Sequence, residues 1–337
     1  MAATIHDVAK RAGVAHGTVS RYLNGYTLRE KNRLLVKKAI EELDYQENIL
    51  AKGLKGNRSM TIAVVVPGYT AIFSMFVTSF IEKVVERDNY SLILCDFEGD
   101  PQNFKKKLTF LKNRSIDGII LFPVPELREC VPFLREYAGT GIPIVLVNEL
   151  LDGFESDIVL VDNFNASFRA VEKLILDNHC RIACITGVEQ AYTAQQRLAG
   201  YYEAMQAYDL KVEEWWVQRS DFTSSGGHAA VKALYRVQDP PTAIFIANYF
   251  TTVGAAIALH ELHLRIPEDV SLFGFDYFKP FDVAEPPLTV VQQPLEKIGE
   301  QAANMLLRRI RGDNADFPQT VTLNTTMLIR DSVQRRS

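Results

Sequence analysis

The stretch Thr4–Asn24, TIHDVAKRAGVAHGTVSRYLN, decides how the N-terminal part of this chain folds. Four apolar residues recur there at helical spacing: Ile5, Val8, Ala9 and Ala12. They give a first short helix one apolar face. Thr4 stands at the N-cap position, and Asp7 three residues later supports the first turn. Gly13 is expected to end this helix.

A second short helix is expected from about Ala15. Its Val19 and Leu23 point to one side, and Gly17 and Arg21 point to the opposite side. A helix with a buried face and a basic outer face, placed after a glycine turn, is the helix-turn-helix pattern, whose second helix lies in the DNA major groove. An ordinary helical hairpin has the same periodicity, so the pattern alone leaves both interpretations open.

The same stretch closely resembles the headpiece of the lactose-repressor (LacI/GalR) family of bacterial transcription regulators. The family pattern T-I-x-D-V-A-x-x-A-G-V-S-x-x-T-V-S-R-x-L-N-G matches Thr4–Gly25 at every fixed position except one, where Ala15 replaces the usual Ser. A match of this length is specific. The resemblance favours the DNA-binding interpretation over the plain hairpin.

Charge is distributed unevenly along the chain. Residues 1–60 contain 11 Lys and Arg against 6 Asp and Glu, whereas the remaining 277 residues contain 26 against 35. A basic N-terminal module on an acidic body is typical of a small DNA-binding unit carried by a larger domain that does not bind DNA. A length of 337 residues also predicts two or three domains.

Targeting and metal signals are lacking in the sequence. The first 25 residues have no apolar signal core, and no window of 18 residues is apolar enough to span a membrane. We therefore expect a cytoplasmic protein without membrane contact. His179, Cys180 and Cys184 lie close together in the sequence, but no second pair of ligands follows. We expect neither a metal nor a cofactor.

A third helix is predicted over Leu28–Leu43. Its apolar face consists of Leu35, Val36, Ala39, Ile40 and Leu43. This face would close a three-helix core, which gives a helix-turn-helix DNA-binding domain at residues 1–45. Arg29 replaces the Ser that usually caps this helix in the family, so the start of the helix is less well defined than its body.

Residues 46–60 are predicted to form a hinge between the domains. The segment resembles the family's hinge pattern Y-x-x-N-x-x-A-R-x-L through Tyr45, Asn48, Ala51, Lys52 and Leu54. An isolated helix of about eight residues is marginal in water, and Gly53 weakens it further. We therefore expect the hinge to order only against DNA and a partner chain. A plain flexible linker is the alternative.

From Thr61 onward, short apolar runs alternate with amphipathic helical windows. The runs cover residues 62–66, 92–95, 118–122, 144–147, 158–161, 182–185, 243–246 and 270–275. The helical windows include Phe76–Arg87, Phe104–Asn113, Phe164–Asn178 and Thr251–Leu262. Strands and helices that alternate at this spacing predict parallel sheets with helices on both faces.

Two such units in tandem resemble the type I periplasmic-binding-protein fold of the family's effector domain. The predicted fold is thus a small all-α headpiece plus an α/β effector-binding and dimerisation domain, 61–337, with two doubly wound parallel-sheet lobes. The resemblance places the crossings between the lobes near Asp162, Gln292 and Thr320. The N-lobe would then comprise about 61–161 and 293–320, and the C-lobe about 162–292 and 321–337.

The resemblance also indicates which residues contact DNA. Arg21, His16 and Gly17 would read base edges, with the arginine making bidentate contacts to guanine. The remaining headpiece candidates are Thr4, Thr18, Ser20, Asn24 and Arg33, the last four as phosphate contacts. In the hinge, Lys52 and Lys55 would lie near phosphates, and Leu54 would wedge into a minor-groove base step.

Effector contacts are expected where strands end, because ligands of open α/β sheets bind beyond the carboxyl ends of the strands. The residues there mix carboxylates, amides and aromatic rings, which suits a polyhydroxylated ligand. With the family resemblance, the expected contacts are Phe73, Asn148, Asp162, Arg197, Phe222, Asn248 and Asp276. Competing roles are a surface position for Arg197, a turn cap for Asp276 and a core position for Phe73.

One departure from the family concerns this site. The usual A-N-D-x-x-A-x-G has Tyr249 in place of the Asp. This substitution brings bulk near the mouth of the expected site, so the usual sugar contacts are not assumed to be complete.

Together these features predict a sequence-specific transcriptional regulator of the repressor type, controlled by a sugar or related metabolite bound between the lobes. It would act as a homodimer on a pseudo-palindromic, double-stranded DNA operator. A sugar-binding protein for uptake is the alternative, but that class needs a signal peptide and no headpiece. An enzyme would need an acid–base pair, for which Glu149 and Asp162 are the best candidates, and no catalytic motif accompanies them.

Overall fold

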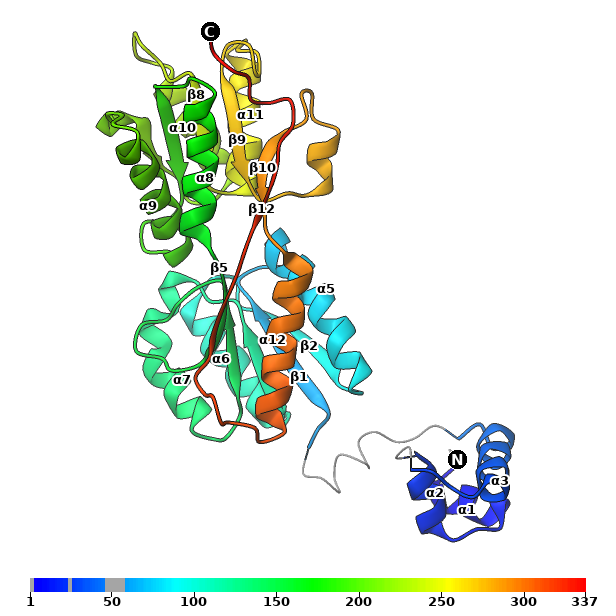
Figure 1. Cartoon of the computed structure of the whole chain (residues 1–337). Helices are drawn as coiled ribbons and strands as arrows, with labels where there is room; N and C mark the ends of the chain where they lie inside the picture. Colours follow the sequence, from blue (N-terminus) through cyan, green and yellow to red (C-terminus); the bar gives the residue numbers. More distant parts are fainter. Residues whose placement is uncertain (1–2, 24–25, 46–57) are drawn as a thin grey trace. The chain divides into compact units, whose positions relative to one another are not determined.

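The computed structural model describes residues 3–23, 26–45 and 58–337 (Figure 1). The chain separates into two compact units, Met1–Met60 and Thr61–Ser337. Among the described residues, no helix combines the length and the apolar character that crossing a membrane requires.

The N-terminal unit contains the helices α1 (Ile5–Ala12), α2 (His16–Leu23) and α3 (Glu30–Glu42). A capping box begins α1, as predicted. The Thr4 hydroxyl accepts a hydrogen bond from the Asp7 N–H, and the Asp7 carboxylate accepts one from the Thr4 N–H at 2.9 Å. Gly13 ends the helix in the left-handed conformation, with φ 64°, which a residue without a Cβ adopts at little cost.

The core of this unit is small and aliphatic. Its buried members are Val8, Ala9, Ala12, Val19, Val36 and Ala39. The third helix begins two residues later than predicted, and Arg29 before it makes no side-chain cap hydrogen bond. Leu35, predicted to lie in the apolar face, is 39% exposed, because the face that meets the other helices is centred on Val36 and Ala39.

The first lobe of the larger unit, the N-lobe, is built on a parallel sheet in the order β11-β5-β4-β3-β1-β2. Its strands are β1 (Thr61–Val66), β2 (Ser91–Asp96), β3 (Gly118–Leu121), β4 (Ile144–Val147), β5 (Asp157–Val161) and β11 (Thr320–Leu323). Its helices are α5 (Ile72–Arg87), α6 (Pro101–Asn113), η1 (Pro125–Cys130), α7 (Val131–Ala138) and α12 (Leu295–Ile310).

The second lobe, the C-lobe, repeats this plan in the order β12-β10-β9-β8-β6-β7, with only the edge strand β12 antiparallel. Its strands are β6 (Ile182–Thr186), β7 (Val217–Arg219), β8 (Ala243–Ile246), β9 (Ser271–Phe275), β10 (Thr289–Gln292) and β12 (Thr326–Leu328). Its helices are α8 (Asn163–Leu176), α9 (Tyr192–Ala207), η2 (Glu214–Trp216), α10 (Ser224–Leu234), α11 (Tyr249–Glu261) and η3 (Lys279–Asp282).

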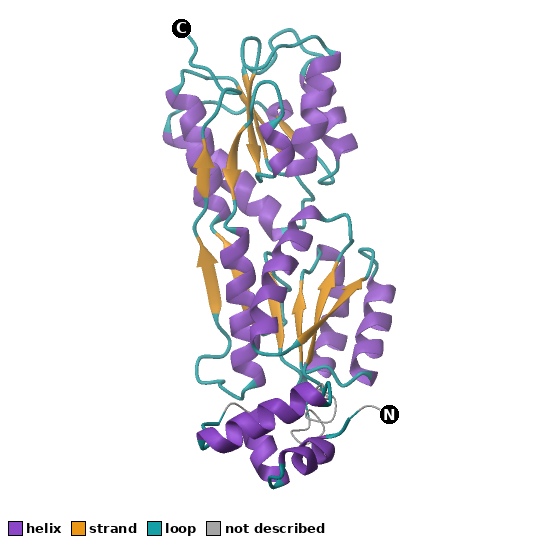
Figure 2. Ribbon diagram, turned by 90° about the vertical axis from the view of Figure 1, so that its right-hand side faces the viewer, coloured by secondary structure: helices purple, strands orange, loops and turns teal. Residues whose placement is uncertain are grey.

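Each of the eight predicted apolar runs forms a strand. The central strands are buried on both faces, since helices flank both sheets (Figure 2), and such strands have continuous apolar sequences. The strands β7, β10, β11 and β12 were not predicted, because three or four residues with polar members carry no clear periodicity.

The chain passes between the lobes three times (Figure 1). It does so after β5 at Asp162, after β10 at residues 293–294, and after β11 at residues 324–325. The prediction of a third crossing near Thr320 is wrong. β11 pairs in parallel with β5 and so belongs to the N-lobe, and the last segment of the C-lobe begins at Thr326 instead of 321.

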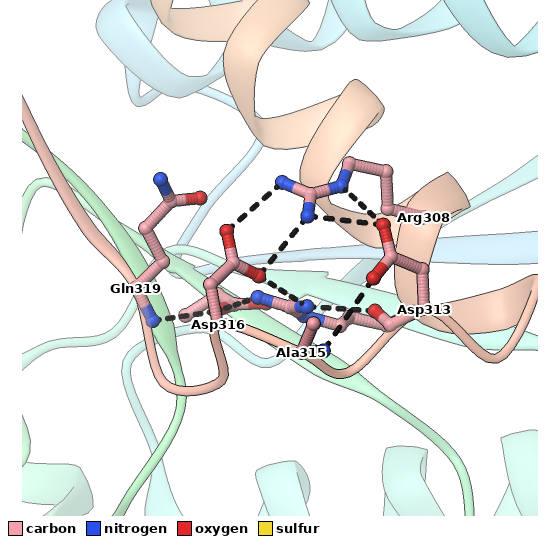
Figure 3. A network of polar contacts seen from close by, with 7 residues as sticks. Arg308, Asp313, Ala315, Asp316 and Gln319 are labelled. Carbon is pink, nitrogen blue, oxygen red and sulfur yellow. Dashed lines mark hydrogen bonds and ion pairs between the residues drawn. The ribbon is translucent and has the colours of Figure 1, made fainter.

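A buried ion pair holds β11 in this place. The Asp157 carboxylate, at the start of β5, accepts hydrogen bonds from the Arg309 guanidinium at 2.6 and 3.0 Å and from the Gln319 N–H at 2.8 Å. The Asp157 and Arg309 side chains are 0% and 3% exposed. Around this pair, Arg308 binds the carboxylates of Asp313 and Asp316 (Figure 3).

Replacement of Asp157 by Ala is expected to lower the free energy of unfolding by about 3 kcal/mol, because the buried Arg309 guanidinium loses its only fully buried carboxylate among the described residues and keeps Asp316 and the Asp313 carbonyl alone. Urea-induced unfolding followed by circular dichroism measures this loss. As a control, Asp313→Ala removes a half-exposed partner of Arg308 and should leave the unfolding midpoint near that of the unaltered protein. Equal losses in the two variants would contradict the assignment.

Candidate functional site

The outer face of α2 carries the residues predicted to read DNA bases. Arg21 and Gly17 are exposed, and a Cβ added to Gly17 would meet nothing within 4 Å. His16 is half-buried, because its ring contacts the ring of His6 on α1, with 4.8 Å between the ring centroids. Sequence reasoning did not select His6, which occupies a variable position of the headpiece pattern.

The other predicted DNA contacts have diverse surroundings. Thr18 and Ser20 are half-buried on α2. The Thr4 hydroxyl also donates to the Asp7 carboxylate at 2.6 Å, which lowers the pKa of that carboxyl. Arg33 forms an ion pair with Glu30 at 2.6 Å. Four candidates lie outside the described residues: Asn24, Lys52, Leu54 and Lys55.

A cavity of about 690 Å³ opens between the two lobes of the larger unit. Both lobes contribute to its walls at the carboxyl ends of their strands, which is where parallel sheets bind ligands. Five of the seven predicted effector contacts line it: Phe73, Asn148, Phe222, Asn248 and Asp276. The other two, Asp162 and Arg197, do not.

The local backbone explains how several of these side chains reach the cavity. Phe73 lies in the first turn of α5, with its ring in edge-to-face contact with Phe122. Asn248 caps α11 and follows β8 directly. Asn148 and Asp276, each just after a strand, adopt left-handed φ values of 67° and 74°, which Asn and Asp tolerate better than most residues.

Phe222 reaches the cavity only because Gly187 has no side chain. A Cβ at Gly187 would lie 1.9 Å from the Phe222 ring. The glycine after β6 therefore makes room for an aromatic wall that comes from the loop before α10.

Asp162 and Arg197 lie outside the cavity lining and form hydrogen bonds to other residues. The Asp162 carboxylate caps α8 by accepting from the Asn165 N–H at 3.1 Å. The Arg197 side chain is 3% exposed, donates to Asn163 at 2.8 Å and to the Ala247 carbonyl, and stacks 3.6 Å from the Phe275 ring centre. Burial lowers the pKa of this guanidinium to about 10, so it remains charged at neutral pH. The competing surface position for Arg197 is wrong, because the side chain is buried.

The ionisable side chains of the cavity lining are all acidic. Its acidic side chains are Glu126, Glu149, Asp221 and Asp276, and no described Lys, Arg or His lines the cavity. In the described part of the chain, no group of three or more His, Cys, Asp or Glu residues is arranged to hold a metal.

Comparison with known proteins agrees with this architecture. Residues 4–48 match the bacterial regulatory proteins of the lacI family, and residues 171–333 match the periplasmic binding protein-like domain. The HTH-type transcriptional repressor PurR of Actinobacillus pleuropneumoniae serotype 3 (strain JL03) is 30% identical over 334 residues, which cover 98% of each chain. The chain belongs to the lacI family.

Solved structures show the same fold. The transcriptional regulator CelR in complex with cellobiose is 30% identical, with a TM-score of 0.73 over 98% of this chain and 99% of that chain. The lac repressor dimer bound to operator and the anti-inducer ONPF is 23% identical, with a TM-score of 0.83 over 99% and 100%. This second similarity concerns the fold alone.

Membership of the lacI family decides between the function classes. This chain is a DNA-binding transcriptional regulator with a domain for a small-molecule effector, and it is not an enzyme. The uptake protein that shares the two-lobed fold is excluded as well, because residues 4–48 are a lacI-family headpiece.

In this lacI-family regulator, two hydrogen bonds, made by Glu149 and Arg128, join the lobes near the cavity. Sequence reasoning did not assign either residue to effector binding. Glu149, just after β4 in the N-lobe, accepts from the N–H of Tyr192 at the start of α9 in the C-lobe, at 2.7 Å. Nearby, Arg128 of the N-lobe donates to the Gln190 carbonyl at 2.7 Å. The position of Glu149 beside Asn148, after the end of β4, was the sequence signal that could have identified it.

Glu149 is 6% exposed, and this burial raises the pKa of its carboxyl to about 7. The folded protein therefore holds a proton at Glu149 over a pH range in which the unfolded chain has released it. Because the folded state binds more protons there, Glu149 makes the protein less stable as the pH rises from about 4.5 toward 7.

Glu149→Gln keeps the oxygen that accepts from Tyr192 and removes the titration. The stability of this variant relative to the unaltered protein is expected to rise between pH 4.5 and 7 by up to about 3 kcal/mol and then to level off. Urea unfolding of both proteins at a series of pH values measures the difference. A difference that does not change with pH would refute the assignment.

Proposed function

We propose that this chain represses transcription as a homodimer on a pseudo-palindromic operator, and that its effector is a neutral sugar or a similar polyhydroxylated molecule. In this proposal residues 1–45 bind DNA, residues 46–60 form the hinge, and residues 61–337 bind the effector and pair the two chains. Such a regulator works in the cytoplasm, beside the bacterial chromosome.

The composition of the cavity lining supports the effector class. Aromatic rings come from both lobes, among them Phe73, Phe122 and Phe222. Amide and carboxylate groups stand between them, and Asn148 has a buried Oδ1 atom without a hydrogen-bond partner among the described residues. Rings that cover an apolar face and polar groups that meet hydroxyls suit a sugar.

The charge of the lining narrows the class further. Four carboxyl groups and no described cation face the cavity, and only that of Glu149 has a pKa raised to about 7, so a phosphate or carboxylate group on the ligand would be repelled without compensation. The buried cation Arg197, whose charge interacts with the lining carboxyls of Asp276 and Glu149, is already engaged by Asn163, Ala247 and Phe275. The cellobiose bound by CelR, a relative with 30% identity, is a neutral sugar of this kind.

The proposed effector contacts divide into two groups. Direct contacts are made by Phe73, Asn148, Phe222, Asn248 and Asp276, all in the lining. Arg197 acts indirectly, as a buried positive charge that interacts with Asp276, and Asp162 acts by capping α8.

The proposed DNA contacts follow the exposure of α2. Arg21 reads a guanine, His16 makes a single base contact, and the open space at Gly17 admits a thymine methyl or a water. Phosphate and supporting contacts are assigned to Thr4, Thr18, Ser20, Asn24 and Arg33. The hinge contacts of Lys52, Leu54 and Lys55 rest on the sequence pattern.

A panel of neutral and phosphorylated sugars, including cellobiose, tests the effector class. A neutral sugar at about 100 times its Kd is expected to add about 2.7 kcal/mol to the stability of the full chain, seen as a rise in Tm. Phe222→Ala should weaken that sugar's binding about tenfold or more, a loss of about 1.4 kcal/mol. Stabilisation by phosphorylated sugars alone would reject the proposal.

Arg21→Ala is expected to cost about 1–3 kcal/mol of operator binding and to relax specificity at one base pair per half-site. A site selected from random DNA, followed by titration of single-base variants at fixed salt, measures both effects. Lys37→Ala, an exposed basic residue on α3, serves as the control and should leave base preference unchanged. If Arg21→Ala weakens operator and random DNA equally, Arg21 only holds phosphate.

A further inference from the structure

A run of aromatic rings leads from the effector cavity to the contact between the lobes. Tyr249 lines the cavity, and its ring centroid lies 4.9 Å from that of Phe278 and 4.7 Å from that of Phe281. The Phe278 ring in turn lies 5.3 Å from the ring of Phe76. Phe76 belongs to α5 of the N-lobe, whereas the other three rings belong to the C-lobe.

The C-lobe part of this run is firmly held. Tyr249, Phe278 and Phe281 are each at most 7% exposed. The loop that carries the two phenylalanines is tied down at Asp282, which accepts from the Tyr277 hydroxyl and from Arg330, each at 2.7 Å. Phe278 is therefore packed into the core of the C-lobe.

Phe76, the N-lobe member of this run, lies on α5, whose first turn lines the cavity. Ile72 and Phe73, in the first turn of α5, line the cavity and pack against the C-lobe core. Phe76 lies one turn further, on the same side of the helix as Ile72. It is 46% exposed, and its ring contacts the ring of Phe278.

We propose that Phe76 and Phe278 are positioning residues for Tyr249, so that the place of this cavity wall depends on how the two lobes meet. An effector that shifts the Tyr249 ring must move Phe278 with it, and so must alter the contact with Phe76. This inference rests on the proposed function only in taking the cavity as the effector site. The family pattern has an aspartate at the position of Tyr249, and an aspartate has no ring to form this contact.

The contact is tested by measuring the distance between the lobes in the full chain without effector or DNA. Nitroxide labels are placed by Lys106→Cys on α6 and Glu203→Cys on α9, both exposed positions, after Cys180→Ser removes the exposed native thiol. Dilution with unlabelled chain keeps the measured distances within one subunit. Pulsed electron–electron double resonance then gives the distribution of distances between the two nitroxide labels.

Phe76→Ala is expected to broaden this distribution and to shift its mean. Phe110→Ala is the matched control, because Phe110 is an equally exposed phenylalanine on α6, at 45%, that faces Arg114 of its own lobe. Phe76→Leu, which keeps the side chain apolar, guards against a folding defect and should give an intermediate shift. Identical distributions for the Phe76 and Phe110 variants would overturn the proposal.

The dependence of Tyr249 on Phe76 is tested by a double-mutant cycle. The structure gives no direct ring contact between the two residues, so coupling between them must pass through Phe278. Tyr249→Leu combined with Phe76→Ala is expected to shift the distance no more than Phe76→Ala alone. Additive shifts would show two independent contacts and overturn the proposal. Since no sugar is used, a negative sugar panel leaves this result unaffected.

Discussion

The connections between the two lobes lie side by side, and this constraint governs how the effector domain can move. β5 and β11 are neighbours in one sheet, and β10 and β12 are neighbours in the other, so the chain crosses along one edge of each sheet. The Asp162 N–H donates to the Leu323 carbonyl at 3.0 Å, which ties the first crossing to the third. Lobes joined in this way open and close about the shared edge.

The cavity and this edge share hydrogen bonds. Gln293, the first residue after β10, donates to the Asp276 carboxylate, which lines the cavity. Glu149 and its partner Tyr192 join the lobes through a polar contact, whereas Phe76 and Phe278 join them through apolar rings. Three residues of the cavity lining are thus linked to the joining of the lobes: Asp276 through Gln293, Glu149 through Tyr192, and Tyr249 through Phe278.

Much of the fold could be predicted, because the relevant signals are local. The Thr4 cap, the stop at Gly13 and the apolar spacing around Val8 specify α1, and doubly buried strands such as β1 appear as continuous apolar runs. The cavity position also followed, since residues after parallel strands converge at one edge. Its lining includes Phe73, Asn148, Phe222, Asn248 and Asp276.

The parts that could not be predicted depend on residues far apart in the sequence. Arg309 lies 152 residues from Asp157, and their pairing keeps β11 in the N-lobe. Arg197 is withdrawn from the cavity by Asn163, Ala247 and Phe275. Burial in the folded chain raises the pKa of the Glu149 carboxyl. The sequence by itself thus determined the headpiece, the paired α/β lobes and the strand ends that face the cavity, because helix caps and periodicity act within a few residues. Only the tertiary structure decided which charges face the cavity and which are buried behind it, because desolvation and ion pairing depend on what the folded chain brings together.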